Sequence, residues 1–207
     1  PWRAAHSRRP SVLPDPLLAV WTNLAEHLAG RRVVEEMWIG QGLACWILDG
    51  PAGGALVAWN ESSPEPEALI DLYLGESPQA IDLWGNRRPI ERSAGRHRLA
   101  LTRSPTVIDG VDVRLARFRA GFGIDPDFAA STYAVHDHTL KLRNPWNRTI
   151  TGRVRFTGPD GWKFTPRQVP FTISAGQDFE APIELTFPIS AVAGTKLIRA
   201  QVELEAE

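Results

Sequence analysis

Residues 43–59, LACWILDGPAGGALVAW, decide the fold of the first part of the chain. Two short apolar runs, 43–48 and 55–59, flank a Gly- and Pro-rich connection, which is the spacing of consecutive strands. Both runs are apolar on both faces. This pattern predicts central strands, covered on one side by a second sheet and on the other by a helix or by a neighbour outside the chain.

Short apolar runs separated by turn residues recur on both sides of this stretch. They predict strands at 33–39, 69–74, 79–83, 97–101 and 111–118. One helix precedes them, since Asp15 and Pro16 supply a cap and a first-turn proline, and apolar residues then recur at helical spacing up to Gly30. Its apolar stripe consists of Leu17, Trp21, Leu24 and Leu28.

The last third of the chain alternates cleanly between apolar and polar residues, as a strand with one buried face does. The inward rows are Ile150, Gly152, Val154, Phe156; Phe179, Ala181, Ile183, Leu185, Phe187; and Ile198, Ala200, Val202, Leu204. We therefore predict an all-β chain of two β-sandwich domains in tandem, the second immunoglobulin-like, with one N-terminal helix.

The predicted division of the chain has four parts. Residues 1–15 form an irregular N-terminal segment, and 16–30 a helix leading into the first sandwich. Residues 31–119 form that β-sandwich, and 120–207 the Ig-like β-sandwich. A length of 207 residues suits two domains of about 100 residues each.

The composition of the chain limits the classes of partner that we expect. The formal charge is −1, with 23 basic and 24 acidic side chains, so no net field draws a polyanion and no nucleic acid is expected. No run approaches the roughly 18 apolar residues of a membrane span, so no span is expected in this chain. Residues 1–10 lack the apolar core of a signal peptide, which would lie upstream.

The only methionine is Met37, so we expect a piece of a longer protein. The single cysteine, Cys45, is interpreted as a small core residue.

The stretch IDLWGNRRPIE, residues 81–91, places a tryptophan and two arginines around a Gly-Asn pair. Gly85-Asn86 is a pair that accepts the backbone of a two-residue hairpin turn, so a hairpin is the favoured interpretation. A binding site with Trp84, Arg87 and Arg88 is the alternative.

Carboxylates are the first candidates for catalysis, because a glycosidase needs two of them opposed across the sugar. The available side chains are Asp71, Asp82, Asp109 and Asp112. Each lies in a predicted strand or turn, and none lies in a stretch whose sequence indicates a pocket. We therefore predict structural roles for all four and no catalytic residue. Motifs for a serine hydrolase, a phosphate-binding loop and a zinc protease do not occur, and no cofactor is expected.

His136 and His138 lie two residues apart on a predicted strand and would share a face, which is the geometry of a two-histidine metal edge. No third ligand is evident. A solvated strand face is therefore the favoured interpretation, with no metal.

Eight tryptophans are many for this length, and exposed aromatic rings are what a sugar-binding surface uses. Trp21, Trp38, Trp46 and Trp59 lie within apolar patterns and are predicted to be core. Trp2, Trp84 and Trp146 are the candidates for exposure. The candidate sugar-binding residues are Trp84, Trp146 and Arg87.

The first part of the chain resembles the end of a bacterial glycoside hydrolase with a (β/α)-barrel catalytic domain. The resemblance rests on residues 22–30, 33–60, 81–91 and 97–112, with matches at Asp82, Gly85, Asn86, Pro105 and Gly110. It implies a last barrel helix leading into an accessory β-sandwich.

The second part, NPWNRTITGRVRFTGPDGWKFTP at 144–166 with a turn at Gly176, resembles the immunoglobulin-like module that accompanies bacterial α-galactosidases. The matching residues are Asn144, Pro145, Gly152, Pro159, Gly161, Trp162 and Pro166. The resemblance implies a packing role for Trp162.

Together these resemblances imply a non-catalytic accessory region of a larger, exported glycoside hydrolase, periplasmic or extracellular. The implied partner is a catalytic domain of the same polypeptide that these residues do not contain. The alternative is a carbohydrate-binding module that stacks exposed tryptophans on a polysaccharide.

Overall fold

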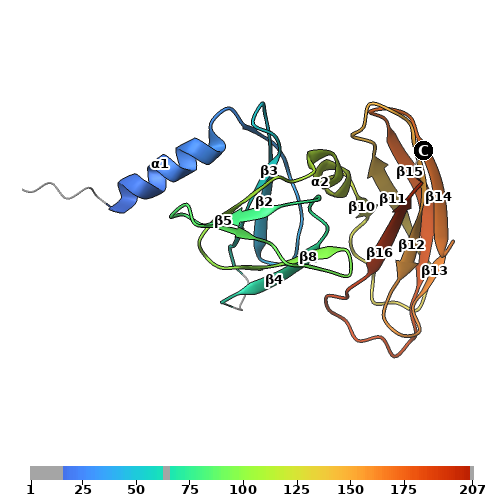
Figure 1. The fold of residues 1–207 in the computed structure, drawn as a ribbon. Helices are drawn as coiled ribbons and strands as arrows, with labels where there is room; N and C mark the ends of the chain where they lie inside the picture. The colour runs from blue at the N-terminus through green and yellow to red at the C-terminus, as the bar shows by residue number, and fades with distance from the viewer. Residues whose placement is uncertain (1–15, 63–65, 206–207) are drawn as a thin grey trace, which may run out of the picture.

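The computed structural model describes residues 16–62 and 66–205 and is built mainly from β-strands, with two short helices (Figure 1). The predicted irregular segment 1–15 lies outside the described residues. All strand pairs in the described part are antiparallel, and the sheets stay open rather than closing into a barrel. The predicted all-β, sandwich-type fold class is confirmed.

Residues 16–112, here called the N-terminal half, contain a six-stranded sheet of order β1-β2-β3-β9-β5-β6 and a three-stranded sheet of order β4-β8-β7. The strands are β1 Arg32–Glu36, β2 Leu43–Asp49, β3 Ala55–Asn60, β4 Ala68–Leu72, β5 Gln79–Ile81, β6 Arg87–Pro89, β7 Arg92–Ser93, β8 Arg96–Leu101 and β9 Thr106–Asp109. One core cluster joins the two sheets through Cys45, Ile47, Leu56, Ile70 and Leu99. Cys45 is core as predicted, and burial raises the pKa of its thiol to about 12.

Helix α1, Pro16–Leu28, covers part of the other face of the six-stranded sheet. Its Leu24 and Leu28 pack against a second cluster, which consists of Leu48, Ala55, Ile81 and Val107. Strands β2 and β3 are thus apolar on both faces because one face meets the smaller sheet and the other meets the helix. The interpretation of residues 43–59 is confirmed.

The strand predicted at 111–118 is wrong, since helix α2, Val113–Ala120, occupies most of this stretch. Asp112 caps it, because its Oδ1 accepts a hydrogen bond from the Leu115 backbone N at 3.1 Å. Ala116 belongs to the core between the first two sheets, while Phe118 belongs to the core of the following sheets. A short helix that contacts two cores has apolar residues at mixed spacings, and these imitate strand alternation.

Residues 121–205, here called the C-terminal half, form two further sheets, of order β10-β11-β15-β13 and β14-β12-β16. The strands are β10 Gly123–Asp125, β11 His136–Arg143, β12 Ile150–Thr157, β13 Lys163–Thr165, β14 Gln168–Ile173, β15 Asp178–Thr186 and β16 Arg199–Leu204. The predicted inward row of β12 is buried and its neighbours face outward, so alternation placed this strand correctly. The core between the sheets is rich in phenylalanine, with Phe156 and Phe164 stacked at 5.4 Å between ring centroids.

Candidate functional site

The hairpin at 81–91 exists, but its loop is longer than predicted. Strands β5 and β6 pair up to Ile81 and Arg87, and the Asp82 backbone N donates to the Asn86 carbonyl at 3.2 Å. Gly85 alone has a positive φ, of 86°, so the two-residue Gly-Asn turn is wrong. Glycine in the left-handed position is typical of a three-residue hairpin loop instead.

Asp82 organises this loop from within. Its Oδ1 accepts hydrogen bonds from the backbone N of Trp84 and of Asn86, each at 2.9 Å, and its Oδ2 accepts one from Asn86 Nδ2 at 2.7 Å. Partial burial acts to raise the pKa of Asp82, but hydrogen bonds from Asn86 and Trp84 outweigh it and hold the pKa below its usual range. Asn23 of α1 then donates to the Asp82 and Leu83 carbonyls, so the loop is fastened to the helix.

The candidate sugar-binding residues do not form one group. Trp84, 61% exposed, lies at the hairpin loop, and the exposed Arg87 follows it on β6. Trp146 instead packs against the core of the C-terminal half, with its ring centroid 5.5 Å from that of Phe118. Trp84 does not line either of two clefts found in the described residues, of about 780 and 350 Å³.

The prediction that Trp21, Trp38 and Trp46 are core residues is wrong, because 69%, 77% and 43% of their surfaces are exposed. Trp59 is half-buried, with Trp46 meeting it edge-on at a centroid distance of 5.1 Å. Apolar neighbours in sequence do not show which side of an element is covered.

Each candidate carboxylate contacts a neighbouring part of the fold. Asp71 lies between Arg96 and Arg98 of the adjacent strand, with N–O separations of 3.3 and 3.8 Å. Asp82 organises the hairpin loop and Asp112 caps α2. These contacts are those of structural side chains.

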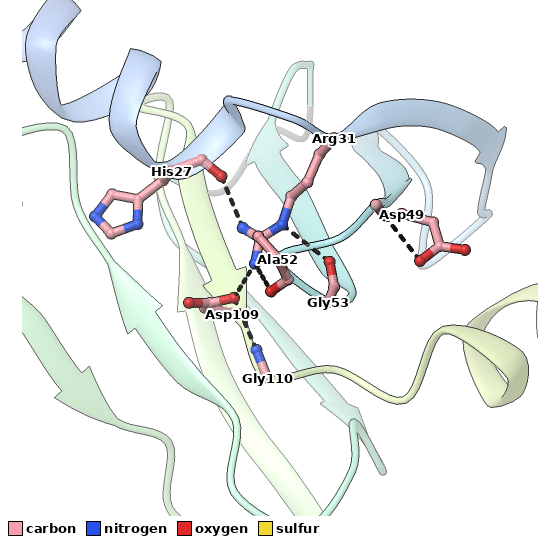
Figure 2. Close-up of polar contacts among 8 residues, drawn as sticks. His27, Arg31, Asp49, Ala52, Gly53, Asp109 and Gly110 are labelled. Carbon is pink, nitrogen blue, oxygen red and sulfur yellow. Dashed lines mark hydrogen bonds and ion pairs between the residues drawn. The ribbon is translucent and has the colours of Figure 1, made fainter.

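The fourth carboxylate, Asp109, accepts a hydrogen bond from Arg31, whose side chain is 3% exposed, at 2.6 Å (Figure 2). The same guanidinium donates to the His27, Ala52 and Gly53 carbonyls at 2.7, 3.0 and 3.0 Å. It therefore ties the end of α1 to the β2–β3 connection and to β9. A buried arginine that donates to four acceptors holds these segments together, and this set of contacts is called the Arg31 latch below.

The solvated-face interpretation of the two histidines is wrong. His138 is 7% exposed and His136 is half-buried, with its ring stacked on Phe187 at 4.9 Å between centroids. The face of β11 that carries them points inward, because Leu140 and Leu142 on the same face belong to the core between the two sheets. In residues 16–62 and 66–205, no group of three or more His, Cys, Asp or Glu side chains is placed to hold a metal ion.

His138 is nevertheless the most unusual polar side chain of the C-terminal half. Its Nδ1 lies 2.7 Å from the Pro126 carbonyl oxygen, which can only accept, so Nδ1 carries the proton. In the neutral ring this leaves Nε2 as an acceptor, and Nε2 is buried with no partner among the described residues. An unsatisfied buried polar atom costs about 1–3 kcal/mol, so such atoms are rare without a reason.

His138 lines a cleft of about 780 Å³ in the C-terminal half. Its walls come from β10, β11, β13 and β15, from the segment 126–131 and from the connection between β15 and β16, which loops below the sheets in Figure 1. Six of the side chains that line it are tryptophan or phenylalanine: Trp38, Phe122, Phe128, Trp162, Phe164 and Phe187. This volume is within the range of about 300–1,000 Å³ of small-molecule sites.

Sequence reasoning missed this cleft. The alternation around His138 indicated that a polar residue shared the inward face of β11, and that signal could have marked it as buried. Nothing in the sequence indicated that Trp38, which follows β1 in the N-terminal half, would reach the wall of a cleft in the other half. Trp162 packs tilted against Phe187 at 5.1 Å, consistent with the packing role that the resemblance implied, and it also lines the cleft.

No helix in the described part of the chain is long and apolar enough to cross a membrane. Residues 144–205 match the family model of the NPCBM-associated, NEW3 domain of alpha-galactosidase. This match supports an accessory domain of a glycoside hydrolase. No curated protein matches the chain.

Proposed function

We propose that the chain is a non-catalytic accessory region of a larger glycoside hydrolase, in which it supports or spaces a (β/α)-barrel catalytic domain of the same polypeptide. In this proposal the division near residue 120 separates a supporting sandwich from an immunoglobulin-like one. The observation that carries the proposal is the match of residues 144–205 to a domain of alpha-galactosidase. A periplasmic or extracellular location follows from the same association.

Helix α1 supports a docking role for the N-terminal half. Leu24 and Leu28 of its apolar stripe pack on the six-stranded sheet, but Leu17 and Trp21 continue the stripe with 59% and 69% of their surfaces exposed. In Figure 1 the N-terminal end of α1 projects away from the sheets. An amphipathic helix gains its stability by burying its apolar face, so the exposed part of this stripe suits a contact with a neighbouring domain.

The test uses the full parental polypeptide and the isolated chain side by side. Trp21→Glu is expected to lower the melting temperature of the parental protein, by about 2–4 °C for each kcal/mol lost, and to leave the isolated chain unchanged. Ala19→Glu is the matched control, because it adds the same charge on the opposite, exposed side of α1. Equal effects of the two variants, or a parental protein without a catalytic barrel, would contradict the proposal.

The non-catalytic part has its own test. The purified chain is expected to release no nitrophenol from nitrophenyl α- and β-glycosides, because the four carboxylates considered above are engaged in separate structural contacts. Release that disappears in one Asp→Asn variant would show instead that this chain is an enzyme.

A second candidate function is carbohydrate binding through the hairpin. It is favoured by Trp84, which is exposed on a loop held by Asp82 and Asn23 and therefore presented at little entropic cost. Arg87 would donate hydrogen bonds to sugar hydroxyls beside the ring. Binding of a soluble polysaccharide that is lost in Trp84→Ala and weakened in Arg87→Ala would support this function, and unchanged binding would end it.

A further inference from the structure

A smaller cleft, of about 350 Å³, lies where the two halves of the chain meet. Its walls come from Trp38, which follows β1, from α2 and the residues directly after it, and from β16. We call it the junction cleft. Of the residues that line it, Arg119 alone is charged and all the others are apolar. An apolar wall with a single polar group is typical of a small-molecule site, and the volume lies in the range of about 300–1,000 Å³ of such sites.

The apolar wall on the side of β16 is incompletely covered. Its inward residues Ala200 and Val202 are half-buried, and Leu204 is 39% exposed. The inward row of the neighbouring strand β12, by contrast, is buried throughout. β16 is an edge strand, and its inward side chains therefore leave apolar surface open to the junction cleft.

The half-buried guanidinium of Arg119 has no counter-charge. Glu35 pairs with Arg117 of the same helix at 3.8 Å, and Asp71 pairs with Arg96 at 3.3 Å. Arg119 itself forms no side-chain hydrogen bond or ion pair in the described part of the chain. Burial, followed by the positive charge of Arg96, lowers the pKa of Arg119. A partly desolvated cation without a partner is costly, and an anion that pairs with it reduces this cost.

The guanidinium nitrogens of Arg119 are accessible to a ligand. In residues 16–62 and 66–205, the polar side-chain atoms that are sealed from solvent and lack a hydrogen-bond partner belong to Asp71, Arg117 and His138. Arg119 has no such partner and is not among them. Its nitrogens therefore retain accessible surface, whereas the Nε2 of His138 does not.

We propose that the junction cleft binds a small carboxylate with an apolar body, in which the carboxylate pairs with Arg119 and the body lies against Phe118, Phe122 and the inward face of β16. The planar guanidinium matches a carboxylate in shape and charge. A phosphate monoester carries a charge of about −1.5 to −2, for which one unshared cation is too few. The site is complete within the chain, so binding does not require a catalytic domain.

The test compares three probes that share an eight-carbon chain and differ in the head group: octanoate, octan-1-ol and octylamine. The isolated chain is titrated with each at neutral pH while heat release is measured. Octanoate is expected to saturate with a Kd of about 1 mM or lower and to bind about tenfold or more tightly than octan-1-ol. Octylamine is expected not to saturate, because its cation meets Arg119.

Arg119→Met is the central variant, and it is expected to weaken octanoate about tenfold or more while octan-1-ol is unaffected. The variant removes a cation without a partner, so its melting temperature is not expected to fall. Arg119→Lys retains the charge and is expected to bind octanoate more tightly than Arg119→Met. Arg114→Met is the matched control, since Arg114 is exposed on the same helix. Lys196→Met is the second control, because Lys196 lines the larger cleft, which shares Trp38 and Phe122 with the junction cleft.

Several outcomes would overturn the inference. The first is a parent chain that binds octanoate no more tightly than octan-1-ol, or that shows no saturation by octanoate up to about 10 mM. Equal weakening of octanoate and octan-1-ol in Arg119→Met would indicate a structural role for the arginine. Loss of octanoate binding in Arg114→Met or Lys196→Met, with Arg119→Met unchanged, would place the carboxylate elsewhere.

Discussion

The two halves of the molecule hold their sheets together in different ways. The N-terminal half uses small and aliphatic core residues, and buried polar contacts fasten its helix and loops, chiefly the Arg31 latch and the Asn23 contact with the hairpin. The C-terminal half packs phenylalanines between two sheets and keeps its ion pairs on the outside, as with Arg153 and Glu203. The C-terminal half has a comparable buried contact, from Asn144 Nδ2 to the Ile173 and Ser174 carbonyls at 2.9 and 3.0 Å, so the two halves differ chiefly in the type of core residue.

The largest expected effect tests the aromatic core. Phe156, 1% exposed and stacked on Phe164, is replaced in Phe156→Ala, and the free energy of unfolding is expected to fall by about 3–5 kcal/mol. Urea unfolding measures this loss. Thr157→Ala, at the exposed neighbouring position of β12, is the control and should stay within about 0.5 kcal/mol. A small loss for Phe156→Ala would mean that aromatic packing does not dominate this half.

The polar latch gives the next effect. Arg31→Met removes four hydrogen bonds and leaves Asp109 without its cationic partner, for an expected loss of about 2–4 kcal/mol by the same measurement. Arg153→Met breaks the exposed pair with Glu203 and is expected to cost about 0–1 kcal/mol. Comparable losses in the two variants would remove the contrast between the halves.

His97 is expected to make the stability of the N-terminal half depend on pH. Its ring is buried and its Nδ1 accepts from the Leu74 backbone N at 3.2 Å, and desolvation, followed by the charge of Arg92, holds its pKa below the usual value. At pH values between the folded and the unfolded pKa, the unfolded chain therefore binds a proton at His97 that the folded chain does not. The contribution to stability is complete above about pH 6.5 and is lost as the pH falls below that value toward the folded pKa, by at most about 1.4 kcal/mol per pH unit.

His97→Asn keeps an acceptor for Leu74 but does not titrate. Its melting temperature is expected to vary less than that of the parent between pH 6.5 and lower values. An unchanged pH profile in this variant would show that another group is responsible.

The smallest effect concerns the hairpin. Asp82→Ala removes the carboxylate that accepts three hydrogen bonds within the loop, and a loss of about 1 kcal/mol is expected, as for other local caps. Because the pKa of Asp82 is depressed, the stability it supplies is present at neutral pH and is lost as the pH falls through its folded pKa. Amide exchange of Trp84 and Asn86 reports the loosening directly. Exchange that does not quicken would indicate that Asn23 alone holds the loop.

Prediction from sequence succeeded where neighbouring residues carry the information. The buried row of β12 follows from period-two alternation, and the two-faced strands β2 and β3 follow from their continuous apolar runs. It failed at α2, because Ala116 and Phe118 contact different cores, and at the loop of the hairpin, where the Asp82 side chain competes with the turn preference of Gly-Asn.

The candidate site divides in the same way. Trp84 was predicted to be exposed and is exposed. Trp146 was also a candidate for exposure, but its ring packs against Phe118. Trp38 was predicted to be a core residue, but it is exposed. Exposure of a tryptophan depends on which element packs over it. For Trp146 that element is α2, whose Phe118 is distant in sequence.

The sequence by itself determined the all-β class, the strands β12, β15 and β16 of the C-terminal half and the buried state of Cys45, because hydrophobic periodicity and turn residues act over a few positions. Only the tertiary structure decided that Arg31 meets Asp109 and that the apolar stripe of α1 continues past the sheet. It also decided that His138 has an unpaired nitrogen beside an aromatic cleft. These features depend on contacts between distant segments, which local patterns do not encode.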